Sequence, residues 1–259
     1  MSAALIKYRG FIWKRALLDL RVRYATTDLG ILWNILHPLA LIGTYTFVFS
    51  FVMGARYPSG SVPYWVFICS GLVPWMAFSD CVTSGATCFQ VSAPYLRKLP
   101  VPEEVFIAER ALSATINLAL SFAVLIAAAL IVGQPPRWHW ALIPVALVML
   151  QMVGFGFGLA LGTITTFFPD VRQLIPMTLR MAMWLAPVLY PMSRVPARVH
   201  GIVRFHPGTP FLIAVHELFL EGKLPENWVW WASGAWVIGS LVVGTLVLRA
   251  LRKEIRDVL

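Results

Sequence analysis

The hydrophobic positions of this chain form long apolar runs, separated by short polar or proline-containing segments. A helix needs about 20 mostly apolar residues to cross a bilayer, and six runs approach or exceed that length. They cover residues 33–54, 64–89, 106–132, 139–168, 173–190 and 228–248. The runs are continuous rather than alternating, and they are too long for strands of a soluble sheet. The pattern therefore predicts an all-α integral membrane protein with six transmembrane helices.

The segments outside these runs differ in composition and predict different structures. Residues 1–32 mix basic with large apolar side chains, which predicts an N-terminal amphipathic helix in the membrane interface, with a cytosolic cap as the alternative. Residues 90–105 are polar and punctuated by proline, and predict either a short docking helix or a solvated loop. Residues 210–220 are apolar but too short to span, so they predict a re-entrant or interfacial hairpin between the fifth and sixth spans.

Composition supports the membrane assignment. Hydrophobic residues make up 59% of the chain and charged residues 13%, against about 25% charged in soluble domains. This excludes a water-soluble enzyme and a disordered chain. Three cysteines without CxxC spacing exclude a disulfide scaffold. Neither a repeat nor a linker divides the sequence, so we expect a single all-helical transmembrane domain over residues 1–259.

The net charge of +9 indicates orientation. With six spans, fifteen of the 21 basic residues fall on one side of the membrane and six on the other. Cytoplasmic segments of membrane proteins carry the excess of Lys and Arg. We therefore expect both termini in the cytoplasm, a multi-pass position in the membrane, and no nucleic-acid partner.

Candidate chemistry is sparse. No GxxxxGK[ST] phosphate loop occurs, so the chain is not expected to hydrolyse ATP alone. We expect no catalytic residue, cofactor site or metal site, because no carboxylate pair or His/Cys cluster has the required spacing. Gly154, Gly158 and Gly162 have the four-residue spacing that lets membrane helices approach closely, which predicts helix packing.

Two charged residues lie deep in predicted spans. Ionisable side chains are energetically costly there, so each is a candidate for a functional role. Arg180 is either an anion contact on a conduction path or a residue that snorkels or pairs with another helix. For Asp80 we expect hydrogen bonding between helices. Aromatic side chains inside the first and fifth spans are compatible with stacking of sugar rings, although core packing is the commoner reason for each.

The order of elements and several motifs resemble the membrane subunit of type 2 ABC exporters for O-antigen, capsular polysaccharide or teichoic acid. The motifs are DLRVRY at 19–24, LGILW at 29–33, PL at 38–39, GLVPW at 71–75, LRKLPVP at 96–102 and APVLY at 186–190. Two positions depart from the family pattern. His206 stands where the family has Asn before Pro207, and Pro169 replaces an Arg before Asp170, with Arg172 as a possible substitute.

The resemblance implies partners and a reaction. The permease would form a homodimer with two separate nucleotide-binding ATPase subunits, which would bind ATP and Mg. The substrate would be a lipid-linked polysaccharide of the O-antigen or capsule type, moved across the inner membrane among membrane lipids. Two alternatives remain: a drug or lipid exporter permease of the same fold, and an intramembrane polyprenyl-linked glycosyltransferase.

The resemblance also implies roles for three groups of residues. The loop at 90–105 would be the coupling helix that contacts the ATPase, through Tyr95, Leu96, Arg97, Lys98, Glu103 and Glu104. The first and fifth spans would line the channel, with candidates Tyr45, Phe49, Trp184, Tyr190 and Arg180. Residues 207–222 would gate the periplasmic side, with candidates Pro207, Pro210, Phe211, His216 and Glu217.

Overall fold

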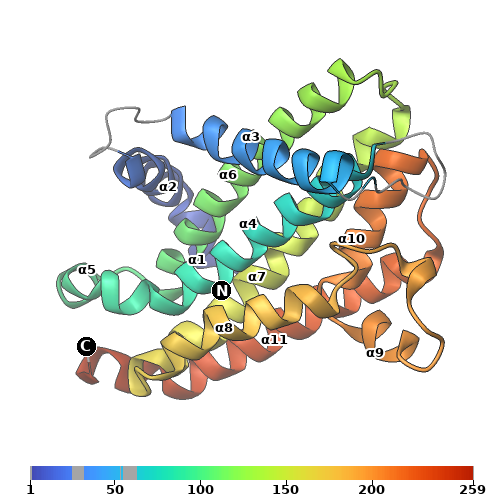
Figure 1. The fold of residues 1–259 in the computed structure, drawn as a ribbon. Coiled ribbons are helices and arrows are strands. Elements are labelled where there is room, and N and C mark those ends of the chain that lie inside the picture. The colour runs from blue at the N-terminus through green and yellow to red at the C-terminus, as the bar shows by residue number, and fades with distance from the viewer. Residues whose placement is uncertain (1, 25–31, 53, 55–62, 259) are drawn as a thin grey trace.

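The computed structural model describes residues 2–24, 32–52, 54 and 63–258, and within these ranges the regular elements are helices (Figure 1). The α-helices are α1 (Ser2–Lys7), α2 (Arg9–Tyr24), α3 (Trp33–Thr46), α4 (Tyr64–Val91), α5 (Ala93–Lys98), α6 (Glu103–Ile131), α7 (Ile143–Phe167), α8 (Val171–Leu185), α9 (His200–Phe205), α10 (Thr209–His216) and α11 (Asn227–Val258). Short 3-10 or π segments are η2 (Phe47–Val52), η3 (Trp138–Leu142), η4 (Met192–Arg194) and η5 (Glu217–Glu221).

Among the described residues, four helical stretches are long and apolar enough to cross a membrane. They are α4, α6, η3 with α7 (Trp138–Phe167), and α11 as far as Arg252, with lengths of 26 to 30 residues. At 1.5 Å per residue, each exceeds the roughly 30 Å hydrocarbon core. These four correspond to the second, third, fourth and sixth predicted spans. The chain is therefore a helical, multi-pass membrane protein.

The first and fifth predicted spans are shorter or less regular. The first consists of the 14-residue α3, with Pro38 inside it, continued by the π-helix η2 to Val52. The fifth, α8, has 15 residues and ends at Leu185, five residues before the predicted end. Ala186 precedes a proline and is extended, which stops the helix. The hydroxyl of Tyr190 then donates to the carbonyls of Trp184 and Leu185. The count of six spans remains a prediction.

Glycines set the packing of α7 on its neighbours. A Cβ added to Gly85 of α4 would lie 2.8 Å from the Cα of Gly158, and one added to Gly162 would lie 2.7 Å from the carbonyl oxygen of Gly85. On the other side of α7, Gly156 faces the backbone of α11 just as closely. The predicted packing role of Gly154, Gly158 and Gly162 is confirmed.

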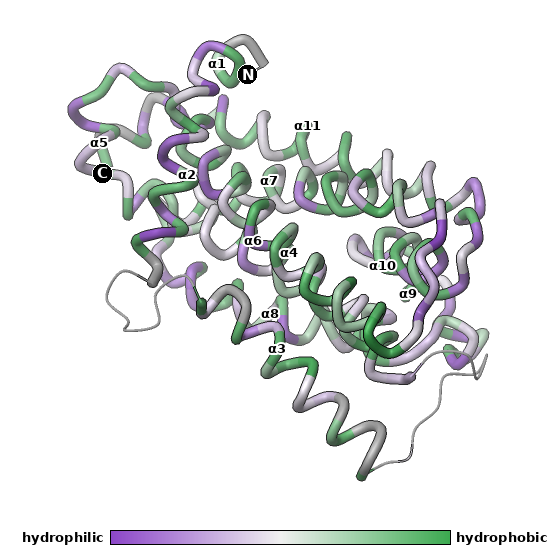
Figure 2. The backbone as a smooth tube through the Cα atoms, turned by 90° about the horizontal axis from the view of Figure 1, so that it is seen from above, coloured by the Kyte–Doolittle hydropathy of each residue, from purple (hydrophilic) through white to green (hydrophobic). Residues whose placement is uncertain are grey.

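The bundle has two distinct ends (Figure 1). The helices α2 and α5 and the C-terminal part of α11 lie at one end, and α9 and α10 lie toward the other. In Figure 2 the most hydrophilic segments lie largely around α2 and α5 and in the connections at the opposite end, with apolar helix between them. This distribution fits a bundle whose middle lies in lipid.

The predicted hairpin region holds one helical segment, formed by α10 and η5 and turned back at Gly222, whose φ is +62°. Its apolar side chains are buried: Phe211 and Leu212 in one core cluster, and Val215, Leu218 and Phe219 in another. The segment contacts α4, α7 and α11. Its re-entrant placement in the membrane remains a prediction.

Candidate functional site

Helix α2 is held against α6 by an apolar stripe and carries charges beside it. Ile12, Ala16 and Leu20 recur every fourth residue and are buried, so they form one face of the helix. Arg15 and Asp19 share the same four-residue spacing on an adjacent face. The sequence thus places one cation and one anion of α2 toward the first turns of α6.

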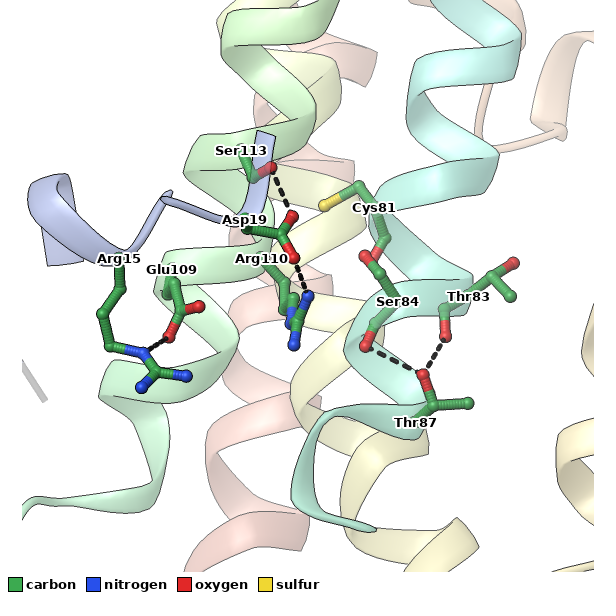
Figure 3. A network of polar contacts seen from close by, with 9 residues as sticks. All are labelled: Arg15, Asp19, Cys81, Thr83, Ser84, Thr87, Glu109, Arg110 and Ser113. Atoms are coloured by element: carbon green, nitrogen blue, oxygen red, sulfur yellow. Dashed lines mark hydrogen bonds and ion pairs between the residues drawn. The ribbon is translucent and has the colours of Figure 1, made fainter. Parts of the chain in front are cut away.

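Arg15 and Asp19 form ion pairs with two residues of α6 that carry the opposite charges (Figure 3). The Nε of Arg15 lies 2.7 Å from an oxygen of Glu109, whose side chain is 3% exposed. Asp19 accepts hydrogen bonds from Arg110 and, at 2.7 Å, from the hydroxyl of Ser113. A buried carboxylate is stable only when it is paired and hydrogen-bonded. The crossed pairs therefore fix both the register and the orientation of α2 on α6.

Arg15 also reaches the short helix α5. Its guanidinium carbon lies 4.4 Å from the centroid of the Tyr95 ring, within the range of a cation–π contact. A second link joins the same segments, because the hydroxyl of Tyr8 donates to the carbonyl of Pro100 at 3.3 Å. The N-terminal helices are thus connected to α5 and to the residues that follow it.

Helix α5 exposes part of the predicted coupling set. Pro94 occupies its first turn, and Leu96 is buried against the Phe89, Val105 and Phe106 cluster. The side chains of Tyr95, Arg97 and Lys98 are exposed. One buried leucine therefore anchors a short helix that presents an aromatic ring and two cations to its surroundings. We call Tyr95, Arg97 and Lys98 the α5 surface.

The acidic members of the predicted coupling set are placed differently. Glu103 and Glu104 begin α6 and are buried, 1% and 5% exposed. Their oxygens lie 2.7 and 3.2 Å from the guanidinium of Arg252 near the end of α11. Carboxylates in the first turn of a helix also stabilise its N-terminus. These two carboxylates attach α11 to the start of α6, and their contact with an ATPase subunit stays a prediction.

The channel candidates lie on several elements. Tyr45 is half-buried on α3 and packs against both large core clusters. The side chain of Phe49 lies outside the described residues. Trp184 and Arg180 are exposed on α8. The hydroxyl of Tyr190 binds carbonyls at the end of α8, so this residue caps the helix. The structure joins Tyr190 to the backbone of Trp184 and places Tyr45 on a separate helix.

The gate candidates lie toward the end of the bundle opposite α5. Pro210 and Phe211 are buried, and Pro207 is half-buried. The ring of His216 is buried, with its centroid 4.3 Å from that of Phe67. Glu217 is half-buried and lies 3.4 Å from the ammonium of Lys223. Pro210, Phe211 and His216 are thus packed in the protein interior, whereas Pro207 and Glu217 are partly exposed.

His206, one of the two departures from the family pattern, shapes the turn before α10. Its Nδ1 accepts a hydrogen bond from the backbone N–H of Gly208 at 3.2 Å, and its ring lies 5.5 Å from that of Trp75. Burial lowers the pKa of His206 from 6.5 to about 4. Arg172, the candidate substitute for the arginine that Pro169 replaces, donates to Gln90 at the end of α4 at 3.0 Å.

Sequence reasoning missed the crossed ion pairs. Arg15 counted only as part of a basic segment, and Glu109 with Arg110 only as polar residues in the first turns of a span. The available signal was the four-residue spacing of Arg15 and Asp19 beside the apolar stripe. What the sequence did not provide was the partner, which lies 94 residues away along the chain for Arg15.

Comparisons with known proteins agree with this architecture. Residues 11–220 match the family described as ABC-2 type transporter. The O-antigen export system permease protein RfbA of Klebsiella pneumoniae is 26% identical over 213 residues, covering 82% of this chain and 80% of the relative. RfbA of Myxococcus xanthus is 27% identical over 224 residues, covering 86% and 85%. The polysialic acid transport protein KpsM of Escherichia coli is 25% identical over 211 residues, covering 80% and 78%. The chain therefore belongs to the ABC-2 type transporter family of membrane proteins.

Proposed function

We propose that this chain is the transmembrane permease subunit of an ATP-driven exporter that moves lipid-linked polysaccharide, of the O-antigen or capsule type, across a bacterial inner membrane. The observation that carries the proposal is the similarity over about four-fifths of the chain to relatives named for O-antigen export and polysialic acid transport. A helical bundle with four long apolar helices supplies the membrane-embedded body that such a subunit needs.

The energy source in this proposal is a separate ATPase that binds ATP and Mg. The chain contains no phosphate loop, and its α5 surface offers a docking site. Leu96 holds α5 in the bundle while Arg97 and Lys98 are exposed. Two cations beside an exposed tyrosine favour an acidic, partly apolar groove on the partner. Motion of the partner would reach α6 and α2 through Arg15.

The conduit in this proposal lies between two copies of the chain. Exposed apolar side chains on α3 and η2 include Leu36, Leu39 and Phe47, and those on α8 include Met177, Met181 and Trp184. Apolar exposure on both elements suits burial against a second protomer or lipid. The homodimer would bring Tyr45, Phe49, Arg180, Trp184 and Tyr190 to the polymer, with residues 207–222 gating the periplasmic side. The positive-inside bias would place both termini in the cytoplasm.

Deletion of the chain in its host tests the export function. We expect loss of surface polysaccharide, intracellular accumulation of the lipid-linked polymer, and restoration by the wild-type chain. Unchanged surface polymer together with new sensitivity to a hydrophobic drug would instead support the alternative exporter. Turnover of a glycosyl donor by the purified chain without an ATPase would support the glycosyltransferase.

Charge reversal on α5 tests the docking surface. We expect Arg97→Glu with Lys98→Glu to abolish copurification of the ATPase subunit and to stop export, because the exposed cations would then repel an acidic groove. The matched control is Arg194→Glu with Arg198→Glu, which reverses two exposed charges in the connection before α9. Equal ATPase copurification by both double variants would contradict the docking role.

A further inference from the structure

Two cavities flank α4 at the same level and share a charged wall. One, of about 260 Å³, lies between α3, α4 and α6 and is lined by the polar side chains His37, Asp80, Asn117 and Ser121. The other, of about 310 Å³, lies between α4 and α8 and is lined by Ser79, Asp80, Thr83 and Arg180. Met76 and Asp80 line both. We call these the α3 cavity and the α8 cavity.

The spacing of residues on α4 explains the shared wall. Met76, Asp80 and Thr83 recur at four and three residues, so they fall on one face of the helix. Asp80 lies eleven residues from the end of α4, about 16 Å along its axis, well inside a span. A carboxylate at that depth is costly, and such residues characteristically line polar pathways. Its place beside two cavities gives it access to a ligand.

Each cavity is also lined by a residue with a buried polar atom that the described residues do not satisfy. Ser79 lines the α8 cavity and Asn117 the α3 cavity, and neither the hydroxyl of Ser79 nor the amide oxygen of Asn117 has a hydrogen-bond partner among the described residues. Buried polar atoms are nearly always paired. The oxygen of Asn117 needs a donor, whereas the hydroxyl of Ser79 can donate or accept. A ligand rich in hydroxyl groups meets both needs.

The remaining lining residues narrow the ligand class. Trp75 closes part of the α8 cavity with an aromatic wall, and Leu179 and Met183 add apolar surface from α8. Carboxylate, guanidinium, hydroxyl and amide groups beside an aromatic wall can hydrogen-bond the rim of a sugar ring while covering its C–H faces. A fully apolar drug would leave the polar groups unsatisfied. The volumes lie near the lower limit for small-molecule pockets, which suits a short stretch of chain.

We propose that the α3 and α8 cavities form one binding site for a glycosyl unit of the transported polymer, with Asp80 as the shared hydrogen-bond acceptor and Ser79, Asn117 and Arg180 around it. The inference rests on the proposed function and deepens it, because the site lies within one protomer and adds α4 to the elements that contact polymer. The carboxylate of Asp80 accepts sugar hydroxyls, and the guanidinium of Arg180 donates to sugar oxygens.

Cysteine labelling in cells tests the site. Thr83→Cys and Ser121→Cys, one in each cavity, are made with Cys69, Cys81 and Cys88 replaced by alanine, and the complete transporter is labelled with N-ethylmaleimide. We compare a strain that makes the polymer with one that cannot. Occupancy by sugar should slow labelling at both positions several-fold in the polymer-producing strain. Thr115→Cys is the matched control, because it lines a different, mainly apolar cavity between α6 and α7.

The outcomes separate this inference from the proposed function. Equal labelling rates in the two strains, with export intact, would mean that the cavities hold only water, and would overturn the site while leaving the permease function. Equal slowing at Thr115→Cys would indicate a general conformational change and would also overturn it. Export that survives deletion of the chain would instead overturn the proposed function. If Thr83→Cys does not accumulate, Ser121→Cys in the α3 cavity provides the measurement.

Export kinetics provide a second measurement. Asp80→Asn keeps the shape of the side chain but removes its charge-assisted hydrogen bonds, so we expect several-fold slower export at equal membrane levels. Ser84→Ala on the same helix is the control, since the Ser84 hydroxyl donates only to the backbone of Cys81 among the described residues. Slowing by both variants alike would point to helix packing and contradict the binding site.

Discussion

The guanidinium of Arg15 lies 4.4 Å from the centroid of the Tyr95 ring, while its Nε contacts Glu109 at 2.7 Å. One side chain from α2 therefore touches both α5 and the beginning of a membrane-spanning helix. An exposed helix of six residues has little stability alone. Its orientation depends on neighbours such as Arg15, and this dependence has measurable consequences.

Removal of the Arg15 cation should loosen the α5 end of the bundle. Arg15→Gln leaves the buried carboxylate of Glu109 without its partner, which we expect to cost about 2 kcal/mol of stability. Thermal unfolding in detergent, followed by tryptophan fluorescence, measures the loss. Lys14→Gln, at an exposed position on the same helix, should have little effect. The double variant Arg15→Gln, Glu109→Gln should recover part of the loss, and a cost equal to the sum of the two single variants would contradict the pairing.

The end of α11 should detach when its ion pairs are removed. Arg252→Gln removes the guanidinium that contacts the buried carboxylates of Glu103 and Glu104, at an expected cost of about 1–3 kcal/mol. We expect faster proteolytic cleavage near the C-terminus, detected by mass spectrometry of the fragments. Arg249→Gln changes an exposed charge one turn earlier and serves as the control. Identical cleavage rates for both variants would show that the ion pairs do not hold this segment.

Addition of one methyl group at Gly85 should push α4 away from α7. In Gly85→Ala, the new Cβ would lie 2.8 Å from the Cα of Gly158, and backbone atoms of a packed helix cannot easily move aside. We expect a loss of about 1–3 kcal/mol from overpacking, measured as a lower unfolding temperature. Gly239→Ala on α11 meets no atom within 4 Å and should be neutral or slightly stabilising.

Acid should destabilise the turn before α10 that His206 holds through its hydrogen bond from Gly208. The pKa of His206 is lowered to about 4 by burial, whereas the unfolded chain binds the proton near pH 6.5. Below pH 6.5 the unfolded state therefore takes up a proton that the folded state does not accept until about pH 4. Stability falls as the pH decreases through this window, by at most about 3 kcal/mol.

The variant His206→Asn isolates this effect. Its amide oxygen can accept the hydrogen bond from Gly208, yet it does not titrate. The unfolding temperature of the wild-type protein should fall between pH 7 and pH 5 more than that of the variant. If both fall equally, other groups control the acid sensitivity.

Much of the fold could be predicted because hydrophobic length is a local property. The runs at 64–89, 106–132, 139–168 and 228–248 correspond to four long apolar helices. The end of the fifth helix could not be predicted from its apolar run. It depends on Pro187 and on the hydrogen bonds from the Tyr190 hydroxyl to the carbonyls of Trp184 and Leu185. The hydrophobic pattern contains no signal for these hydrogen bonds.

The sequence by itself determined that the chain enters a membrane as helices, because transfer free energy adds up along a continuous apolar segment. It also determined where helices approach closely, because the spacing of Gly154, Gly158 and Gly162 removes side chains from one face. Only the tertiary structure decided the partners of the charges. Glu103 pairs with Arg252, Glu109 with Arg15, and Asp80 meets two cavities. Such interactions depend on distances of a few ångströms between residues far apart in the chain, and those distances exist only after the helices have packed.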